Sequence, residues 1–132
     1  KAHCLLQSDT LCYLVEAAAG EKIVIPPNFG HATINHGKET LVMANIVETE
    51  LASNYSRYRQ MKGACYYETV DGLKANNIYG IIPPLRKVNP KAVEGLVISS
   101  KPLYTSFVEK PEKFEWLKQP GNYLKEFEKI FR

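Results

Sequence analysis

The sequence contains few cysteines, and they form no recognisable metal or disulfide pattern. Cys4, Cys12 and Cys65 are odd in number, and their spacing matches no zinc motif. Each has an apolar or aromatic neighbour, so we expect all three to be buried and reduced. Reduced cysteines favour a cytoplasmic location.

Long apolar runs and a strong charge of one sign are also missing. No run reaches the ~18 apolar residues that a membrane span needs, so the sequence predicts no membrane partner. The net charge is +3, from 17 basic and 14 acidic residues, without a basic block interleaved with aromatics. Nucleic acid is therefore not an expected partner. With 132 residues, 45% hydrophobic and 23% charged, the composition is that of a globular domain.

The sequence does not begin with methionine. Residue 1 is Lys, and Ala2–Gln7 already has the pattern of a strand. We therefore expect a fragment or a processed chain, with a fold that is incomplete at its N-terminus. The absence of a signal peptide then excludes no location.

The most informative stretch runs from Gly20 to Asn35. The β-branched residues at 23–25 predict a strand, which Pro26 and Pro27 must end because proline fixes φ and lacks a backbone donor. Asn28 follows where the chain must reverse, and Asn tolerates the left-handed region. In the next strand His31, Thr33 and Asn35 alternate, which places all three on one face.

Further strands with frequent turn signals predict an all-β antiparallel sandwich or barrel. We expect a turn at residues 36–38, with Gly37 at positive φ, and a hairpin turn at Asp71-Gly72. The strand at 40–47 is nearly continuous in apolar residues, so we expect burial on both of its faces. The other expected strands span residues 10–17, 64–70 and 73–80.

The character of the chain changes after Pro90, so we divide it into residues 1–90, a barrel portion, and residues 91–132, an extension with two short helices. Pro111 suits the first turn of one helix, and Pro120-Gly121 ends it. Asn122 is the expected cap of the second, whose apolar stripe predicts core packing.

His31 is the one residue that the strand pattern singles out for chemistry. It is either a hydrogen-bonded strand histidine or a metal ligand, since neutral imidazole binds transition metals. A catalytic metal needs about three protein ligands. His36 should point to the opposite strand face and His3 is remote in sequence, so the chain offers one plausible ligand and any others would precede Lys1.

Two motifs in this stretch carry a family resemblance. The spacing of Gly20, Pro26, His31 and Asn35 resembles the second motif of the cupin superfamily, with Asn28 where glycine is usual. Residues 26–35 are similar to the Pro-Pro-x-aromatic-x-His-x-Thr-x-Asn segment of cupin-type glucose-6-phosphate isomerases. The resemblance covers residues 1–90, and residues 91–132 lie outside it.

The resemblance implies a cupin double-stranded β-helix, a jelly-roll barrel, with a C-terminal helical extension. It implies metal-dependent interconversion of glucose 6-phosphate and fructose 6-phosphate, a step of glycolysis and gluconeogenesis. The cofactor would be a divalent metal, iron in preference to zinc or manganese, with His31 as one ligand. The catalytic Glu would lie before Lys1, while Tyr55 and Thr33 would contact the sugar phosphate. Ser53 departs from the family, which often has His there.

Other interpretations stay open at this point. The chain is alternatively a non-catalytic cupin that binds a sugar or small acid, or an iron cupin oxygenase. Arg57 and Arg59 either bind phosphate or form a solvated face. We expect a homodimer because a missing strand leaves an exposed sheet edge. Alone, the 132-residue chain is expected to be inactive and to bind metal poorly.

Overall fold

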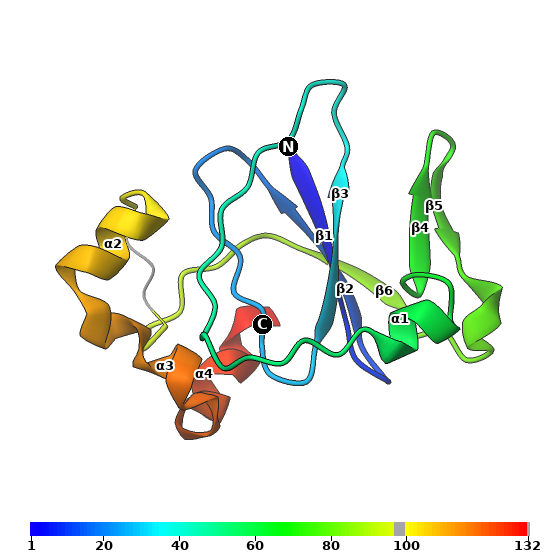
Figure 1. Cartoon of the computed structure of the whole chain (residues 1–132). Helices are drawn as coiled ribbons and strands as arrows, with labels where there is room; N and C mark the ends of the chain where they lie inside the picture. Colours follow the sequence, from blue (N-terminus) through cyan, green and yellow to red (C-terminus); the bar gives the residue numbers. More distant parts are fainter. Residues whose placement is uncertain (97–99, 132) are drawn as a thin grey trace.

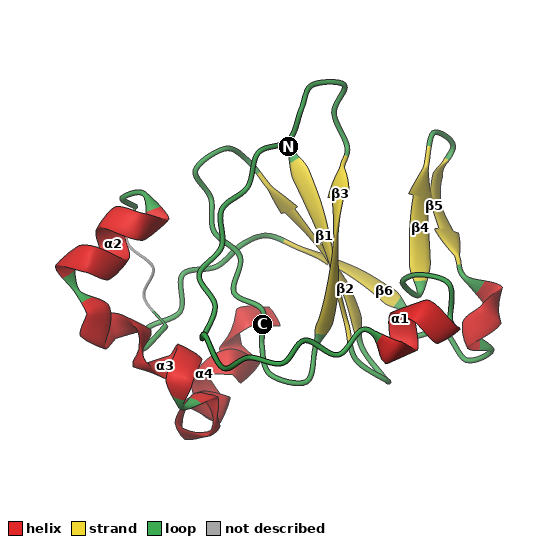
Figure 2. Ribbon diagram, in the orientation of Figure 1, coloured by secondary structure: helices red, strands yellow, loops and turns green. Residues whose placement is uncertain are grey.

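A four-stranded sheet lies at the centre of the computed structural model, which describes residues 1–96 and 100–131 (Figure 1). A separate hairpin stands on one side of this sheet and the C-terminal helices on the other (Figure 2). The strands are β1 Ala2–Gln7, β2 Cys12–Ala17, β3 Gly30–Asn35, β4 Tyr66–Thr69, β5 Gly72–Ala75 and β6 Leu85–Val88. The α-helices are α1 Ser56–Gln60, α2 Leu103–Glu109, α3 Glu115–Lys118 and α4 Leu124–Glu128. Short 3₁₀ turns are η1 Asn77–Tyr79, η2 Pro111–Phe114, η3 Pro120–Tyr123 and η4 Lys129–Phe131.

β1 is an inner strand of the sheet, whose order is β3-β1-β2-β6. It pairs antiparallel with both β2 and β3 along its whole length. β6 adds to β2 in parallel, so the sheet is mixed rather than purely antiparallel. The expected strands at residues 2–7 and 10–17 are confirmed, the second beginning two residues later, at Cys12.

The predicted hairpin at Asp71-Gly72 is also confirmed. It joins β4 to β5, with Thr69 opposite Gly72 and Gly72 at φ 105°. The return strand is shorter than expected, because β5 ends at Ala75 and a 3₁₀ turn follows. Buried Asn76 holds that turn: its side chain accepts a hydrogen bond from the Ile78 amide and donates to the Met61 and Ala64 carbonyls.

The two faces of the central sheet bury different side chains. On one face Leu5 and Leu14 pack with Cys12 and Cys65, and Tyr66 of the hairpin lies against them. On the other face Leu6 and Val15 pack with Cys4 and Tyr13. All three cysteines are buried and free, as expected from the sequence. The Cys12 and Cys65 thiols are hydrogen-bonded, with their sulfurs 3.1 Å apart.

Two expected strands do not form. Residues 23–25 and 40–47 have no strand assignment, because neither joins a hydrogen-bonded ladder in the described part of the chain. In the first segment the apolar pattern reflects burial alone: Val24 packs against the C-terminal helices. In the second, the expected burial on both faces is wrong, since Val42 is 88% exposed and Met43 58%.

The turn after β3 differs from the expectation as well. Gly37 is not among the residues at positive φ, and the chain does not return as a strand beside β3. β3 therefore stays at the edge of the described sheet. The fold is β-rich with mixed pairing and several helices, and residues 1–96 and 100–131 do not close a complete barrel.

The C-terminal segment forms more helical turns than the two helices expected. α2 was not predicted, although Pro111 does begin a helical turn, η2. Asn122 is not the cap of α4: Tyr123 takes that position, and the Asn122 amide donates to Gln119 instead. The predicted apolar stripe is core, because Phe127 and Ile130 pack with Val24 in one cluster. The division at residue 90 stays a prediction.

No helix in residues 1–96 or 100–131 combines the length and the apolar character that crossing a membrane requires.

Replacing Leu5 by Ala tests the importance of the inner strand. Leu5 is 0% exposed, so Leu5→Ala should lower the free energy of unfolding by about 2–5 kcal/mol, measured by urea denaturation. Val42→Ala is the matched control, because Val42 is 88% exposed and its loss should cost less than about 0.5 kcal/mol. Equal effects of the two substitutions would contradict this assignment of the core.

The buried Cys4 thiol should make stability depend on pH in the alkaline range. Burial raises its pKa from 9.0 to about 11, and a hydrogen bond with Thr33 opposes part of that rise. Between these values the unfolded chain has released a proton that the folded chain retains, so the free energy of unfolding falls as pH rises. The fall reaches about 1.4 kcal/mol per pH unit.

The measurement compares the pH dependence of unfolding in the wild type and in Cys4→Ala. Titrations of all other groups contribute to both proteins, so the difference in slope between pH 9 and 11 isolates Cys4. The wild type should lose stability more steeply. Parallel curves would show that the Cys4 thiol is not desolvated in the folded chain.

Candidate functional site

His31, Thr33 and Asn35 lie on one face of β3, as the alternation predicts. All three are exposed, while the intervening Ala32 and Ile34 are half-buried. In the register with β1, His31 lies opposite Leu6 and Thr33 opposite Cys4. The polar row therefore shares its face of the sheet with Leu6 and Cys4. The described part of the chain provides no hydrogen bond or ion pair to the His31 ring.

The proline turn leads directly into β3, the strand that carries His31, as the sequence predicts. The Phe29 amide donates to the Pro26 carbonyl at 3.3 Å, and Asn28 has φ 64°, which is the left-handed region. Gly30 follows directly, and a Cβ there would lie 2.7 Å from the ring of Tyr58. Glycine at position 30 thus lets α1 pack against the start of β3.

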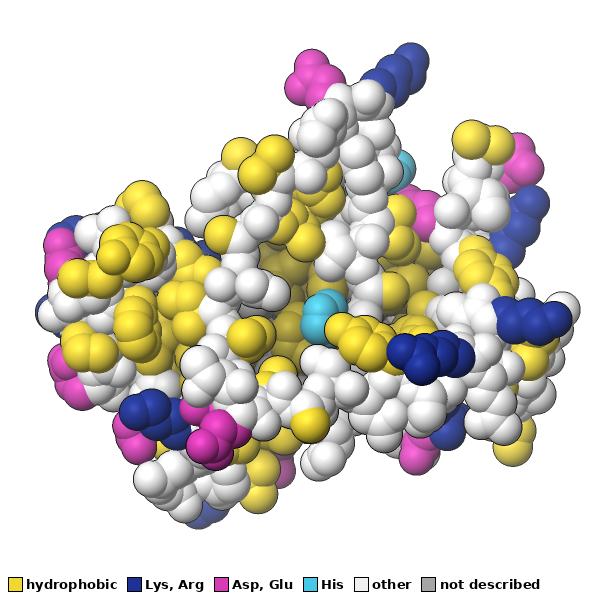
Figure 3. Space-filling model, viewed as in Figure 1, with side chains coloured by type: hydrophobic (Ala, Val, Ile, Leu, Met, Phe, Trp, Pro, Cys, Tyr) yellow, Lys and Arg dark blue, Asp and Glu magenta, His cyan; other side chains and the backbone are white. Residues whose placement is uncertain are grey.

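A hollow of about 650 Å³ opens beside the polar row. Its lining comprises Thr33 and Asn35 from β3 and Thr40, Leu41 and Met43 from the segment that follows. The Asn35 side chain also fixes the intervening turn: it accepts from the Gly37 amide at 3.0 Å and donates to the Glu39 carbonyl at 2.7 Å. Figure 3 shows this side of the molecule hollowed, with apolar side chains around a histidine.

Tyr55 is not brought into hydrogen-bond or ring contact with His31 in the described residues. It is 58% exposed at the N-terminal end of α1. Because residues 56–60 are helical rather than extended, Arg57 no longer shares a face with Tyr55, whereas Arg59, four residues on, lies on the same side of the helix. Arg57 forms an ion pair with Asp9 at 3.1 Å, and its guanidinium lies 5.6 Å from the Tyr79 ring centre.

The donor set around His31 does not by itself fit a catalytic metal. Such a site takes about three protein ligands. Among residues 1–96 and 100–131, the one group of three His, Cys, Asp or Glu side chains arranged to share an ion lies elsewhere. His31 has no second candidate ligand grouped with it in the described residues, and its role as a metal ligand stays a prediction.

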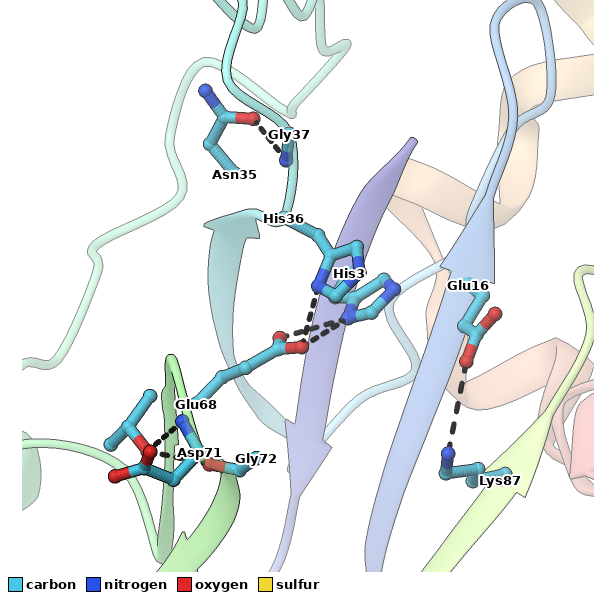
Figure 4. A network of polar contacts seen from close by, with 10 residues as sticks. His3, Glu16, Asn35, His36, Gly37, Glu68, Asp71, Gly72 and Lys87 are labelled. Atoms are coloured by element: carbon cyan, nitrogen blue, oxygen red, sulfur yellow. Dashed lines mark hydrogen bonds and ion pairs between the residues drawn. The ribbon is translucent and has the colours of Figure 1, made fainter.

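The other group is His3, His36 and Glu68, which sequence reasoning missed. Nδ1 of His3 lies 2.8 Å and Nδ1 of His36 also 2.8 Å from oxygens of the Glu68 carboxylate (Figure 4). The two imidazole rings are stacked, with centres 4.2 Å apart. The expectation that the chain offers one plausible metal ligand is thus wrong.

This cluster lies on the face of the sheet opposite His31. His3 is paired with Ile34 in the β1–β3 register, so both point away from the face of His31. His36 does point away from His31, as expected. The sequence gives no indication that Glu68 lies beside His3. This proximity depends on how the hairpin packs against β1 and not on any sequence spacing.

The comparisons with known proteins assign a family. The family model for glucose-6-phosphate isomerase (GPI) matches residues 2–79, which is well over half of the chain. Neither the curated proteins nor the solved structures contain a match. The matched region includes all strands from β1 to β5 and the polar row of β3. This chain belongs to the glucose-6-phosphate isomerase family.

Proposed function

We propose that the chain contributes to isomerisation between glucose 6-phosphate and fructose 6-phosphate. The observation that carries the proposal is the family match over residues 2–79, which includes the exposed row of His31, Thr33 and Asn35. This row borders an open hollow on the surface. The hydroxyl of Thr33 and the polar groups at the rim are suited to hydrogen bonds with sugar hydroxyls.

A divalent metal, iron in preference to zinc or manganese, is part of the same proposal. When bound it would polarise the substrate carbonyl and the neighbouring hydroxyl. His31 would be one ligand, and its position on an exposed strand face, without a partner among residues 1–96 and 100–131, supports that role. Because the described residues supply a single ligand there, the remaining ligands and the catalytic Glu are proposed to precede Lys1.

Tyr55 is proposed to contact the substrate, since its side chain is exposed at the N-terminal end of α1, which packs against the start of β3. A homodimer in the cytoplasm completes the proposal. The free edge of β3 and the exposed side chains of Val42 and Met43 support an association with a second copy. The three free, buried cysteines support a reducing compartment.

His31→Gln tests the function in the protein expressed from the complete gene. Isomerisation of glucose 6-phosphate should fall by about 100-fold or more, because loss of a ligand should cost at least as much as loss of its outer hydrogen-bond partners. Stability should change little, since the exposed His31 ring has no partner in the described residues. A coupled assay of fructose 6-phosphate measures the rate, and urea denaturation measures the stability.

Lys113→Gln serves as the control, because Lys113 is exposed on η2, outside the matched region. It should retain the wild-type rate. A chelator should abolish wild-type activity, and added Fe²⁺ should restore it. A complete protein that binds a sugar phosphate without converting it would favour the non-catalytic cupin instead.

A further inference from the structure

We propose that His3, His36 and Glu68 form a binding site for a divalent transition-metal ion on the face of the sheet opposite His31. The inference does not depend on the isomerase proposal, because no residue of this cluster belongs to the polar row of β3. The ion would be of the zinc, cobalt or iron(II) class, which two imidazoles and one carboxylate suit better than magnesium or calcium.

The three side chains offer ligand atoms that converge on one point. Nδ1 of His3 lies 2.9 Å from Oε1 and 2.8 Å from Oε2 of Glu68, and Nδ1 of His36 lies 2.8 Å from Oε1. All the ligand atoms fall within 4.8 Å of one another. Figure 4 shows both rings turned toward the same carboxylate, one from β1 and one from the turn after β3.

These separations are close to those of a metal site. Ligands about 2.1 Å from a tetrahedral zinc ion lie about 3.4 Å apart. Moving each ring about half an ångström from the carboxylate would therefore make room for an ion between them. Such a shift is within the reach of side-chain rotation, and no strand has to move.

Burial differs across the cluster in a way that suits an ion. The side chains of His3 and Glu68 are 7% and 12% exposed, whereas that of His36 is 56% exposed. Two ligands are thus shielded from water and the third lies at the surface, which gives an entry path. Three protein ligands leave at least one coordination position open on the exposed side.

Neighbouring contacts restrain the ligands. His3 is on β1, which pairs on both edges, and His36 lies within the turn after β3 that the Asn35 side chain bridges by its hydrogen bonds. Glu68 is on the hairpin, which Gln7 of β1 holds beside the sheet. The buried Gln7 side chain accepts a hydrogen bond from the Cys65 amide and donates one to the Tyr79 hydroxyl, on either side of the hairpin. The ligands are therefore preorganised, which reduces the entropy that binding costs.

The same contacts also describe a hydrogen-bonded cluster in which Glu68 accepts from two rings. The two possibilities differ in what removing the carboxylate charge does. Glu68→Gln keeps the shape and an acceptor oxygen but provides a poor metal ligand. Metal binding should therefore respond strongly to Glu68→Gln even where folding does not.

The experiment titrates the 132-residue chain with Co²⁺, following its visible absorption, and with Zn²⁺ by calorimetry. The wild type should bind one ion per chain at this cluster, in place of the poor metal binding expected from the sequence alone. His36→Gln and Glu68→Gln should each weaken binding by at least about tenfold, since even the outer partners of metal ligands contribute about 10–100-fold. His31→Gln is the matched control on the opposite face and should bind like the wild type.

A second measurement does not depend on the variants folding. In the NMR spectrum of the wild type, Zn²⁺ should shift the imidazole resonances of His3 and His36 and leave those of His31 in place. The proposal is overturned if the wild type takes up no Co²⁺. It is equally overturned if His31→Gln alone abolishes binding, or if Zn²⁺ shifts only the His31 resonances.

Discussion

The strand Ala2–Gln7 is hydrogen-bonded along both of its edges, and this double pairing decides what each face of the molecule can hold. Its six residues are matched one to one with β2 on one side and β3 on the other. A strand fixed in this way cannot slip by one residue without turning every side chain to the wrong face. His3, Leu5 and Gln7 are therefore committed to the hairpin side, and Cys4 and Leu6 to the side of His31.

The two faces carry polar groups of different kinds as a result. The row on β3 is exposed and borders an open hollow, so its groups are available to a small molecule from solution. The cluster of His3 and Glu68 is largely shielded and its members contact one another. The sheet separates the two, because neighbouring residues of β3 point to opposite faces. Substitution of His31, whose ring has no partner in the described residues, should leave the geometry of the cluster unchanged, which makes it a suitable control.

Local sequence chemistry was sufficient to predict the parts of the fold that depend on neighbouring residues. The proline turn with Asn28, the hairpin at Gly72 and the alternating row of β3 all follow from backbone preferences a few residues long. The strand expected at 40–47 failed because apolar composition shows only that a segment suits a sheet, whereas a strand also needs a neighbour. Glu68 was missed for the related reason that its distance from His3 is set by packing between two sheets.

The partial burial of the Glu68 carboxylate connects this fold to the proposed metal ion. A carboxylate removed from water is costly unless its oxygens have partners, and both oxygens of Glu68 are met by imidazole nitrogens. An apolar side chain at position 68 would avoid that cost, as Tyr66 does on the same face of β4, where it packs against the cluster that contains Leu5. Keeping the carboxylate there therefore depends on the two imidazoles, since the apolar core does not require a charged group at position 68. A divalent cation, which all three side chains are suited to bind, would add its binding free energy to the stability of the folded chain.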